Sequence, residues 1–126
     1  MSKDETLIEL CNSLLKEIEL APHWVKLIAV GKVKPEGGAS MFAYSFDAAG
    51  KGQASAPDSA TLDLLEKLCQ QMTTASPTGR PWLAGLLRIS SAGEVGADFE
   101  YADANRWAVT PRNLDQRVAE FAAMPV

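Results

Sequence analysis

Few side chains in this sequence of 126 residues are of the kind that carries out covalent or metal chemistry. There is one histidine, His23, and there are two cysteines, Cys11 and Cys69. The usual zinc sites need four cysteine or histidine ligands in closely spaced pairs, and no such pair occurs here. His23 is the only imidazole base for a nucleophile, and it stands between Pro22 and Trp24, where a surface or packing role is favoured. We therefore expect no metal site, no cofactor and no enzymatic activity.

Two short matches to catalytic or nucleotide-binding motifs lack the rest of their patterns. Ser13 and Lys16 fit S-x-x-K, but the companion motifs of that enzyme class are missing. Gly50-Lys51 resembles the end of a phosphate-binding loop, yet Gly52 stands where that loop needs a serine or threonine for magnesium. Neither match predicts a site.

Three carboxylates close in sequence are the remaining candidate for chemistry. Asp98 and Glu100 are two residues apart in a predicted strand, so both side chains leave the same face of the sheet, and Asp103 follows in the turn. Such a pair can work as acid and base if a pocket raises one pKa. We favour a solvated sheet face first and a protein-binding surface second, both over catalysis. The alternate residues are predicted to form the buried face of this strand: Val95, Ala97, Phe99 and Tyr101.

Trp107 follows the polar turn 103–106, and the sequence leaves two interpretations of it open. It can be a plug between the last strand and the last helix, or it can be partly exposed at a surface that binds a partner. An exposed tryptophan beside an arginine, here Arg106, is typical of a binding hot spot. Trp24 and Trp82 each open a predicted strand and are expected in the core or at its edge.

Hydrophobic periodicity predicts three helices, over residues 2–20, 58–74 and 110–124. Ser2 and Glu5 form a capping box for the first helix, and either Asp58 or Ser59 can cap the second. Thr110 and Pro111 are expected as cap and first residue of the third helix. The residues predicted to face inward are Leu7, Ile8, Cys11, Leu14, Leu15 and Ile18, then Leu62, Leu65, Leu68, Cys69 and Met72, then Leu114, Val118, Phe121 and Ala122.

Two β-hairpins are expected between these helices. Residues 24–33 pair with 39–46, and residues 82–89 pair with 95–101, because runs rich in β-branched and aromatic residues flank glycine-containing turns. Residues 47–57 are small and polar and predict a loop. The order α-β-β-α-β-β-α predicts an α+β fold, an antiparallel sheet of at least four strands with helices packed on it.

Composition supports one domain, residues 1–126, and narrows the partners. A chain with 47% hydrophobic residues can bury its own core, so both cysteines are expected as buried, reduced thiols. The net charge of −4 argues against nucleic acid and anionic membranes as partners. No apolar run approaches the roughly 18–20 residues that span a bilayer, and no signal peptide is visible. We therefore expect a cytoplasmic protein.

The last third of the chain carries a family resemblance. The residues in question are Arg80-Pro81-Trp82-Leu83, Phe99-Glu100-Tyr101-Ala102-Asp103, Asn105-Arg106-Trp107 and Thr110-Pro111. This pattern resembles the YezG-like immunity proteins of bacterial polymorphic toxin systems, small α+β proteins with an F-x-Y-x-D type segment followed by a tryptophan. The resemblance implies a protein without enzymatic activity that binds and neutralises a cognate toxin, commonly a nuclease or another cytotoxic effector. The matching motif residues are Glu100, Tyr101, Asp103 and Trp107.

A basic toxin would be attracted by the acidic residues of this segment, because Arg106 is the only basic residue between Glu94 and Trp107. Reversing the charge of all three acids is then expected to impair binding but hardly folding. The candidate partner-binding residues are Asp98, Glu100, Tyr101, Asp103, Arg106 and Trp107.

Other functions stay open at this point. The first alternative is a small acidic effector chaperone of the type III secretion kind, which would have a broad hydrophobic groove and form a homodimer. A subunit of a larger assembly is a second alternative.

Overall fold

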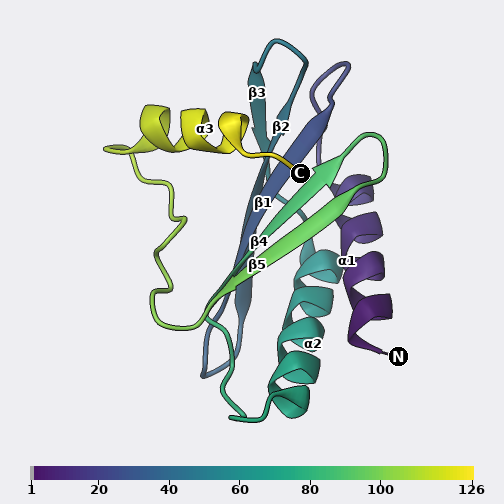
Figure 1. The fold of residues 1–126 in the computed structure, drawn as a ribbon, viewed down its shortest axis with the longest axis vertical. Coiled ribbons are helices and arrows are strands. Elements are labelled where there is room, and N and C mark those ends of the chain that lie inside the picture. The colour runs from purple at the N-terminus through teal and green to yellow at the C-terminus, as the bar shows by residue number, and fades with distance from the viewer. Residues whose placement is uncertain (1) are drawn as a thin grey trace.

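The computed structural model describes residues 2–126, which form three helices and five strands in the order α-β-β-β-α-β-β-α (Figure 1). The elements are α1 (Lys3–Glu17), β1 (Lys26–Val33), β2 (Ala39–Phe46), β3 (Gly52–Ser55), α2 (Ser59–Ala75), β4 (Ala84–Ser90), β5 (Val95–Glu100) and α3 (Leu114–Ala123). All five strands belong to one antiparallel sheet of order β3-β2-β1-β4-β5. The predicted α+β class is confirmed, and the predicted order lacks one strand.

That missing strand is β3, in the segment predicted to be a loop. The Asp47 carboxylate accepts hydrogen bonds from the N–H groups of Ala49 and Lys51, both at 3.0 Å, and turns the chain back along β2. A side chain at Gly52 would lie 2.7 Å from the Phe46 ring, so the glycine lets β3 begin directly against that ring. The small residues that predicted a loop are those that this close turn requires.

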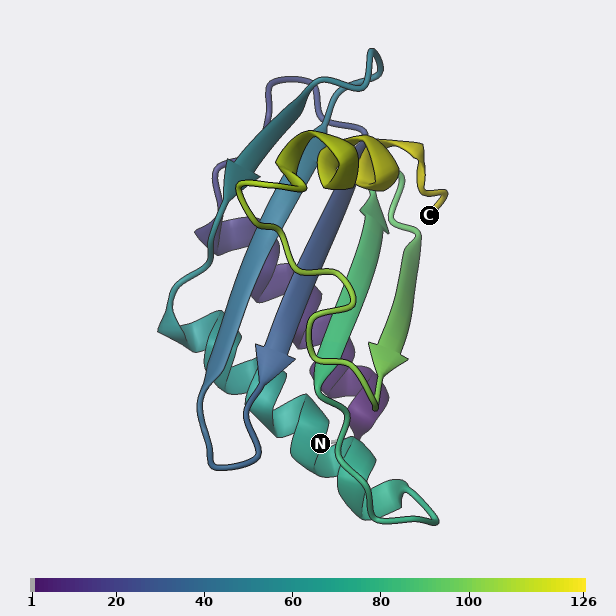
Figure 2. The same cartoon turned by 90° about the vertical axis from the view of Figure 1, so that its left-hand side faces the viewer.

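The helices cover the two faces of the sheet unequally. Figure 2 shows α1 and α2 together behind the sheet, and α3 with the loop that precedes it in front. Side chains alternate along each strand, so Leu27 and Ala29 of β1 face α1 and α2, whereas Ile28 and Val30 face α3. The larger core, on the α1–α2 side, buries Leu10, Cys11, Leu14, Ile18, Leu27, Ala29, Met41, Ala43, Leu65, Leu68, Cys69, Trp82, Leu87 and Ile89. The smaller core, on the α3 side, buries Ile28, Val30, Phe46, Ala84, Leu86, Trp107 and Phe121.

Helix α1 begins as predicted, but its buried face is rotated from the predicted one. The Ser2 hydroxyl accepts a hydrogen bond from the N–H of Glu5 at 3.2 Å, which confirms the cap. Ile8 was predicted to face inward and is 61% exposed, while Leu10 is fully buried. The row that faces the sheet runs through Leu10 and Leu14, and Ile8 lies too far around the helix to join it.

Helix α3 starts later than predicted. Thr110 and Pro111 do not begin it; the chain makes a turn there, and the first helical residue is Leu114, which is exposed rather than inward-facing. At the other end, the Lys26 ammonium donates to the carbonyl groups of Ala122 and Met124, the latter at 2.8 Å. A cation at the negative end of a helix is favourable, so Lys26 joins α3 to β1.

The predictions for the two cysteines and for the inward face of helix α2 are confirmed, but Asp58 in the cap position makes no side-chain capping bond. Cys11 and Cys69 are free thiols, 5% and 4% exposed. The predicted inward residues of α2 are buried or packed against the core. None of the helices in residues 2–126 combines the length and the apolar character needed to cross a membrane.

Candidate functional site

The candidate site is the segment 101–113, which leaves β5, crosses the α3 side of the sheet and leads into α3 (Figure 2). It contains most of the residues on which the family resemblance depends. Its path is set by hydrogen bonds to β1, β5 and α3.

Glu100, the last residue of β5, ties the first turn of this segment together. One carboxylate oxygen accepts the N–H groups of Ala102 at 2.9 Å and Asp103 at 3.3 Å. The other pairs with the guanidinium of Arg106 at 3.2 Å. The hydrogen bond from Ala102, helped by those from Asp103 and Arg106, lowers the pKa of Glu100. Its side chain is only 17% exposed, so Glu100 holds the loop more than it presents charge to a partner.

Asp103 and Asn105 continue this scaffold. The Asp103 carboxylate accepts the N–H of Asn105 at 2.9 Å, and its carbonyl accepts the N–H of Arg106 at 3.2 Å. The amide oxygen of Asn105 accepts a hydrogen bond from the Lys32 ammonium at 2.7 Å. Since Lys32 belongs to β1, this bond fastens the middle of the segment to the centre of the sheet.

Trp107 is the plug, not the exposed anchor, of the two interpretations that the sequence left open. It is 6% exposed and belongs to the core on the α3 side. The Arg106 guanidinium lies 4.9 Å from the Trp107 ring centroid and covers it from outside. A partner can therefore reach Arg106, whose side chain is 57% exposed, but not the indole beneath it.

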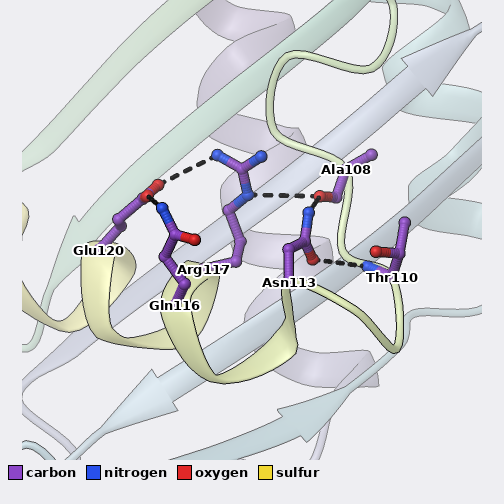
Figure 3. A network of polar contacts seen from close by, with 6 residues as sticks. All are labelled: Ala108, Thr110, Asn113, Gln116, Arg117 and Glu120. Carbon is purple, nitrogen blue, oxygen red and sulfur yellow. Dashed lines mark hydrogen bonds and ion pairs between the residues drawn. The ribbon is translucent and has the colours of Figure 1, made fainter.

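The turn into α3 is closed by the network shown in Figure 3. Asn113 accepts the N–H of Thr110 at 2.8 Å and donates to the carbonyl of Ala108 at 3.0 Å. Arg117 donates to the same carbonyl at 3.3 Å and to Glu120 at 3.0 Å. These bonds hold residues 110–113 in a turn, which explains why the helix begins only at Leu114.

The carboxylate of Asp98 lies at the surface and forms an ion pair with Arg88, a residue that the sequence analysis missed. Its side chain is 56% exposed and pairs with Arg88 of β4 at 3.4 Å. Arg88 could have been found from the hairpin register, because it stands opposite Gly96, and a side chain at Gly96 would lie 2.7 Å from the guanidinium. The acidic surface is thus partly neutralised on its own sheet.

A cleft of about 330 Å³ opens between these groups. Its lining includes Arg88, Asp98, Arg106, Trp107 and Pro125, so it offers both signs of charge beside apolar side chains. Within residues 2–126, no group of three or more His, Cys, Asp or Glu side chains is arranged to hold a metal ion.

The predicted buried face of β5 is only half correct. Ala97 and Phe99 are half-buried and pack against the α1–α2 side of the core. Val95 is 48% exposed and Tyr101 38% exposed, and β5 is the outer strand, which has a neighbouring strand on one side only. Tyr101 is held through its carbonyl, which accepts Arg80 at 3.0 Å, and its ring is available to a partner.

The cysteine thiol and the imidazole, which are the groups with potential reactivity, lie outside this segment. A second cleft, of about 370 Å³, runs beside α2 and includes Cys69, whose pKa is raised by burial. A thiol with a raised pKa is a poor nucleophile. His23 is exposed in the turn before β1, in the left-handed region with φ of 58°.

In comparisons with known proteins, no family model and no curated protein matches the chain. The relationship to the YezG-like immunity proteins therefore stays a hypothesis that depends on the residues of this segment.

Proposed function

We propose that this is an immunity-type protein that binds a cognate protein toxin and blocks its activity. The observation that supports the proposal is the build of segment 101–107. Glu100 binds the loop and Trp107 is buried, while the exposed Asn105 accepts a hydrogen bond from Lys32. Tyr101, Asp103 and Arg106 are exposed in this segment, which follows the strand that carries Asp98. A loop whose internal hydrogen bonds fix the positions of a few exposed side chains is typical of a binding surface.

We call this surface the β5-loop surface and define it by Asp98, Tyr101, Asp103 and Arg106. It combines two carboxylates with an exposed tyrosine and an arginine, and tyrosine and arginine are enriched among the hot spots of protein interfaces. The exposed carboxylates of Asp98 and Asp103 also add negative charge, which attracts a basic partner and raises its association rate. Glu100 is excluded from this surface because its carboxylate serves the loop itself.

This division of roles changes how the proposal is tested. Reversing the charge of Glu100 would disturb the loop as well as the surface, so the tested variant changes only Asp98→Asn and Asp103→Asn. A matched control, Glu9→Gln with Asp63→Asn, removes the same charge from exposed positions on α1 and α2. The partner used in the test is the C-terminal domain of the protein encoded beside the gene, in a form without activity, and the proposal expects this domain to be toxic.

The first double variant is expected to associate with that domain about three- to tenfold more slowly at low salt, since steering depends on local charge. The control is expected to associate like the native protein, and both variants should melt near the native temperature. Equal association rates for the two variants would place the partner surface elsewhere. Failure of the native protein to bind or inhibit the domain would contradict the proposed function.

A mass measurement in solution addresses the alternative function. A stable homodimer that does not bind the toxic domain would favour an effector chaperone of the type III secretion kind. A monomer that forms a complex with the toxic domain would favour the immunity function.

A further inference from the structure

The two edges of the sheet are protected very differently. At one edge, β3 has only four residues and is tied down by Glu19, whose N–H donates to the Ser55 hydroxyl at 2.9 Å and whose carbonyl accepts from Gln53 at 3.4 Å. At the other edge, β5 has six residues and contains no proline and no lysine. Figure 2 shows no element beyond β5 on that side. A strand of this kind is a template for another strand.

The hydrogen-bond phase of β5 shows which backbone groups face outward. The N–H of Ser90 donates to the carbonyl of Glu94 at 2.9 Å, so these two residues form a hydrogen-bonded pair. Such pairs alternate along an antiparallel ladder, and the next ones therefore involve Gly96 and Asp98. The residues between them direct both N–H and C=O away from the sheet: Val95, Ala97 and Phe99.

The side chains of β5 define what an added strand should carry. On the α1–α2 side, Val95, Ala97 and Phe99 present apolar surface that the helices leave partly open. On the α3 side, acidic side chains alternate with them, and Asp98 is more than half exposed. Cross-strand neighbours of complementary type stabilise a sheet. An incoming strand with apolar residues on one face and basic residues on the other would match both faces of β5.

A second copy of this chain fits poorly in the same place. Two antiparallel registers would pair five residues of β5 with its own copy and keep the faces matched. One puts Asp98 opposite Asp98 of the copy, and the other puts Glu94 opposite Glu100. Like charges directly opposite one another are destabilising, so the acidic residues protect this edge from self-pairing.

We propose that the outer edge of β5 is the docking site for one strand of the partner toxin, and that this strand alternates apolar and basic side chains. The inference rests on the proposed function and names the element of the partner that is bound. The added strand would extend the sheet beyond β5, with backbone bonds to Val95, Ala97 and Phe99 and basic side chains beside Asp98.

The decisive variant is Ala97→Pro. Proline removes an outward N–H and places its ring where the partner strand would lie, while the bonds between β5 and β4 stay intact. Its matched control is Ala54→Pro on β3. There the Asp47 N–H donates to the Lys51 carbonyl at 3.1 Å, a phase that also turns the N–H of Ala54 outward.

Binding of both variants to the inactive toxic domain is measured, together with their melting temperatures. Ala97→Pro is expected to bind about tenfold more weakly or worse, and Ala54→Pro to bind like the native protein. Native-like binding by Ala97→Pro would overturn the docking edge and leave the immunity function standing.

A peptide experiment separates the two proposals. A short synthetic peptide of alternating valine and lysine is added to the protein, and exchange of the amide hydrogens of Val95, Ala97 and Phe99 is followed by nuclear magnetic resonance. We expect slower exchange with this peptide and no change with a valine–glutamate peptide. Protection without any binding of the toxic domain would support the docking edge and contradict the immunity function. Equal exchange with both peptides would overturn the docking edge.

Discussion

Glu17 of α1 caps the N-terminus of α2 through Thr61. Its carboxylate accepts the Thr61 N–H at 3.1 Å, the Thr61 hydroxyl, and the N–H of Asp58 at 3.2 Å. Asp58 occupies the cap position, but its own side chain makes no capping bond. Thr61 is fully buried and also meets the Ser13 hydroxyl at 2.7 Å. The helix start is therefore stabilised by a charge from a neighbouring helix, at the end where the helix dipole favours an anion.

Glu17→Ala is expected to lower the free energy of unfolding by about 1–3 kcal/mol. The change leaves the buried donors of Thr61 without their acceptor, and unsatisfied buried donors are costly. The control is Glu9→Ala, an exposed glutamate on the same helix, for which a change within about 0.5 kcal/mol is expected. Urea unfolding measures both. Equal effects for the two variants would contradict a capping role.

Trp107→Ala is expected to destabilise the fold, whereas Tyr101→Ala should not. The indole is buried in the α3-side core, and truncating a buried tryptophan costs about 3–5 kcal/mol. Tyr101 is 38% exposed, so its loss should change stability by less than about 1 kcal/mol and weaken toxin binding instead. Thermal unfolding and binding are measured for both variants. If Trp107→Ala is as stable as the native protein, Trp107 does not contribute to the core on the α3 side of the sheet.

Local patterns predicted most of the fold. The two hairpins could be placed because each turn, 35–38 and 91–93, is encoded by residues adjacent to its strands. Strand β3 could not, because its four residues include no β-branched or aromatic side chain and its pairing depends on the turn made by Asp47. The start of α3 was misplaced for a similar reason, since Asn113 bonds back to Thr110 and delays the helix.

The location of the candidate site could be predicted from the sequence, but which of its residues are structural and which are exposed could not. Residues 98–107 were singled out together, and the structure does bring them together. Which of them face outward depends on contacts from distant elements, such as Lys32 to Asn105 and Arg88 to Asp98. The contact between Arg88 and Asp98 follows from the register of a hairpin, but the contact between Lys32 and Asn105 does not. For the same reason, the local sequence pattern could not decide that Trp107 is buried or that Glu100 binds the loop.

Cys11 is expected to make the protein less stable at alkaline pH. Burial raises the pKa of this thiol from 9.0 to about 11, so the unfolded chain loses its proton first as the pH rises. The neutral thiol therefore contributes stability that is fully present below pH 9.0 and is lost on the way to about pH 11. The loss amounts to roughly 3 kcal/mol, because one pKa unit corresponds to about 1.4 kcal/mol.

Comparison of the native protein with Cys11→Ala isolates this effect. Burial lowers the pKa of Lys26, which acts in the opposite direction over alkaline pH, and this contribution is common to both proteins. Urea unfolding at several pH values should show a steeper decline for the native protein than for the variant. Parallel declines would contradict a buried thiol that stays protonated.

Glu100 is expected to order the loop and not the whole fold. Its carboxylate holds two N–H groups and Arg106, so Glu100→Ala should speed hydrogen exchange at Ala102 and Asp103 while exchange in β1 stays slow. Because these bonds lower its pKa, the stabilising contribution is present above the ordinary value, near 4.5, and is lost as the pH falls through the lower folded value. Acidification of the native protein should therefore loosen residues 101–107 as the variant does at neutral pH. Asp98→Ala is the matched control, since its carboxylate pairs with Arg88 of β4. If both variants leave hydrogen exchange in the loop unchanged, Glu100 does not order the loop, and its carboxylate would then be counted with the β5-loop surface.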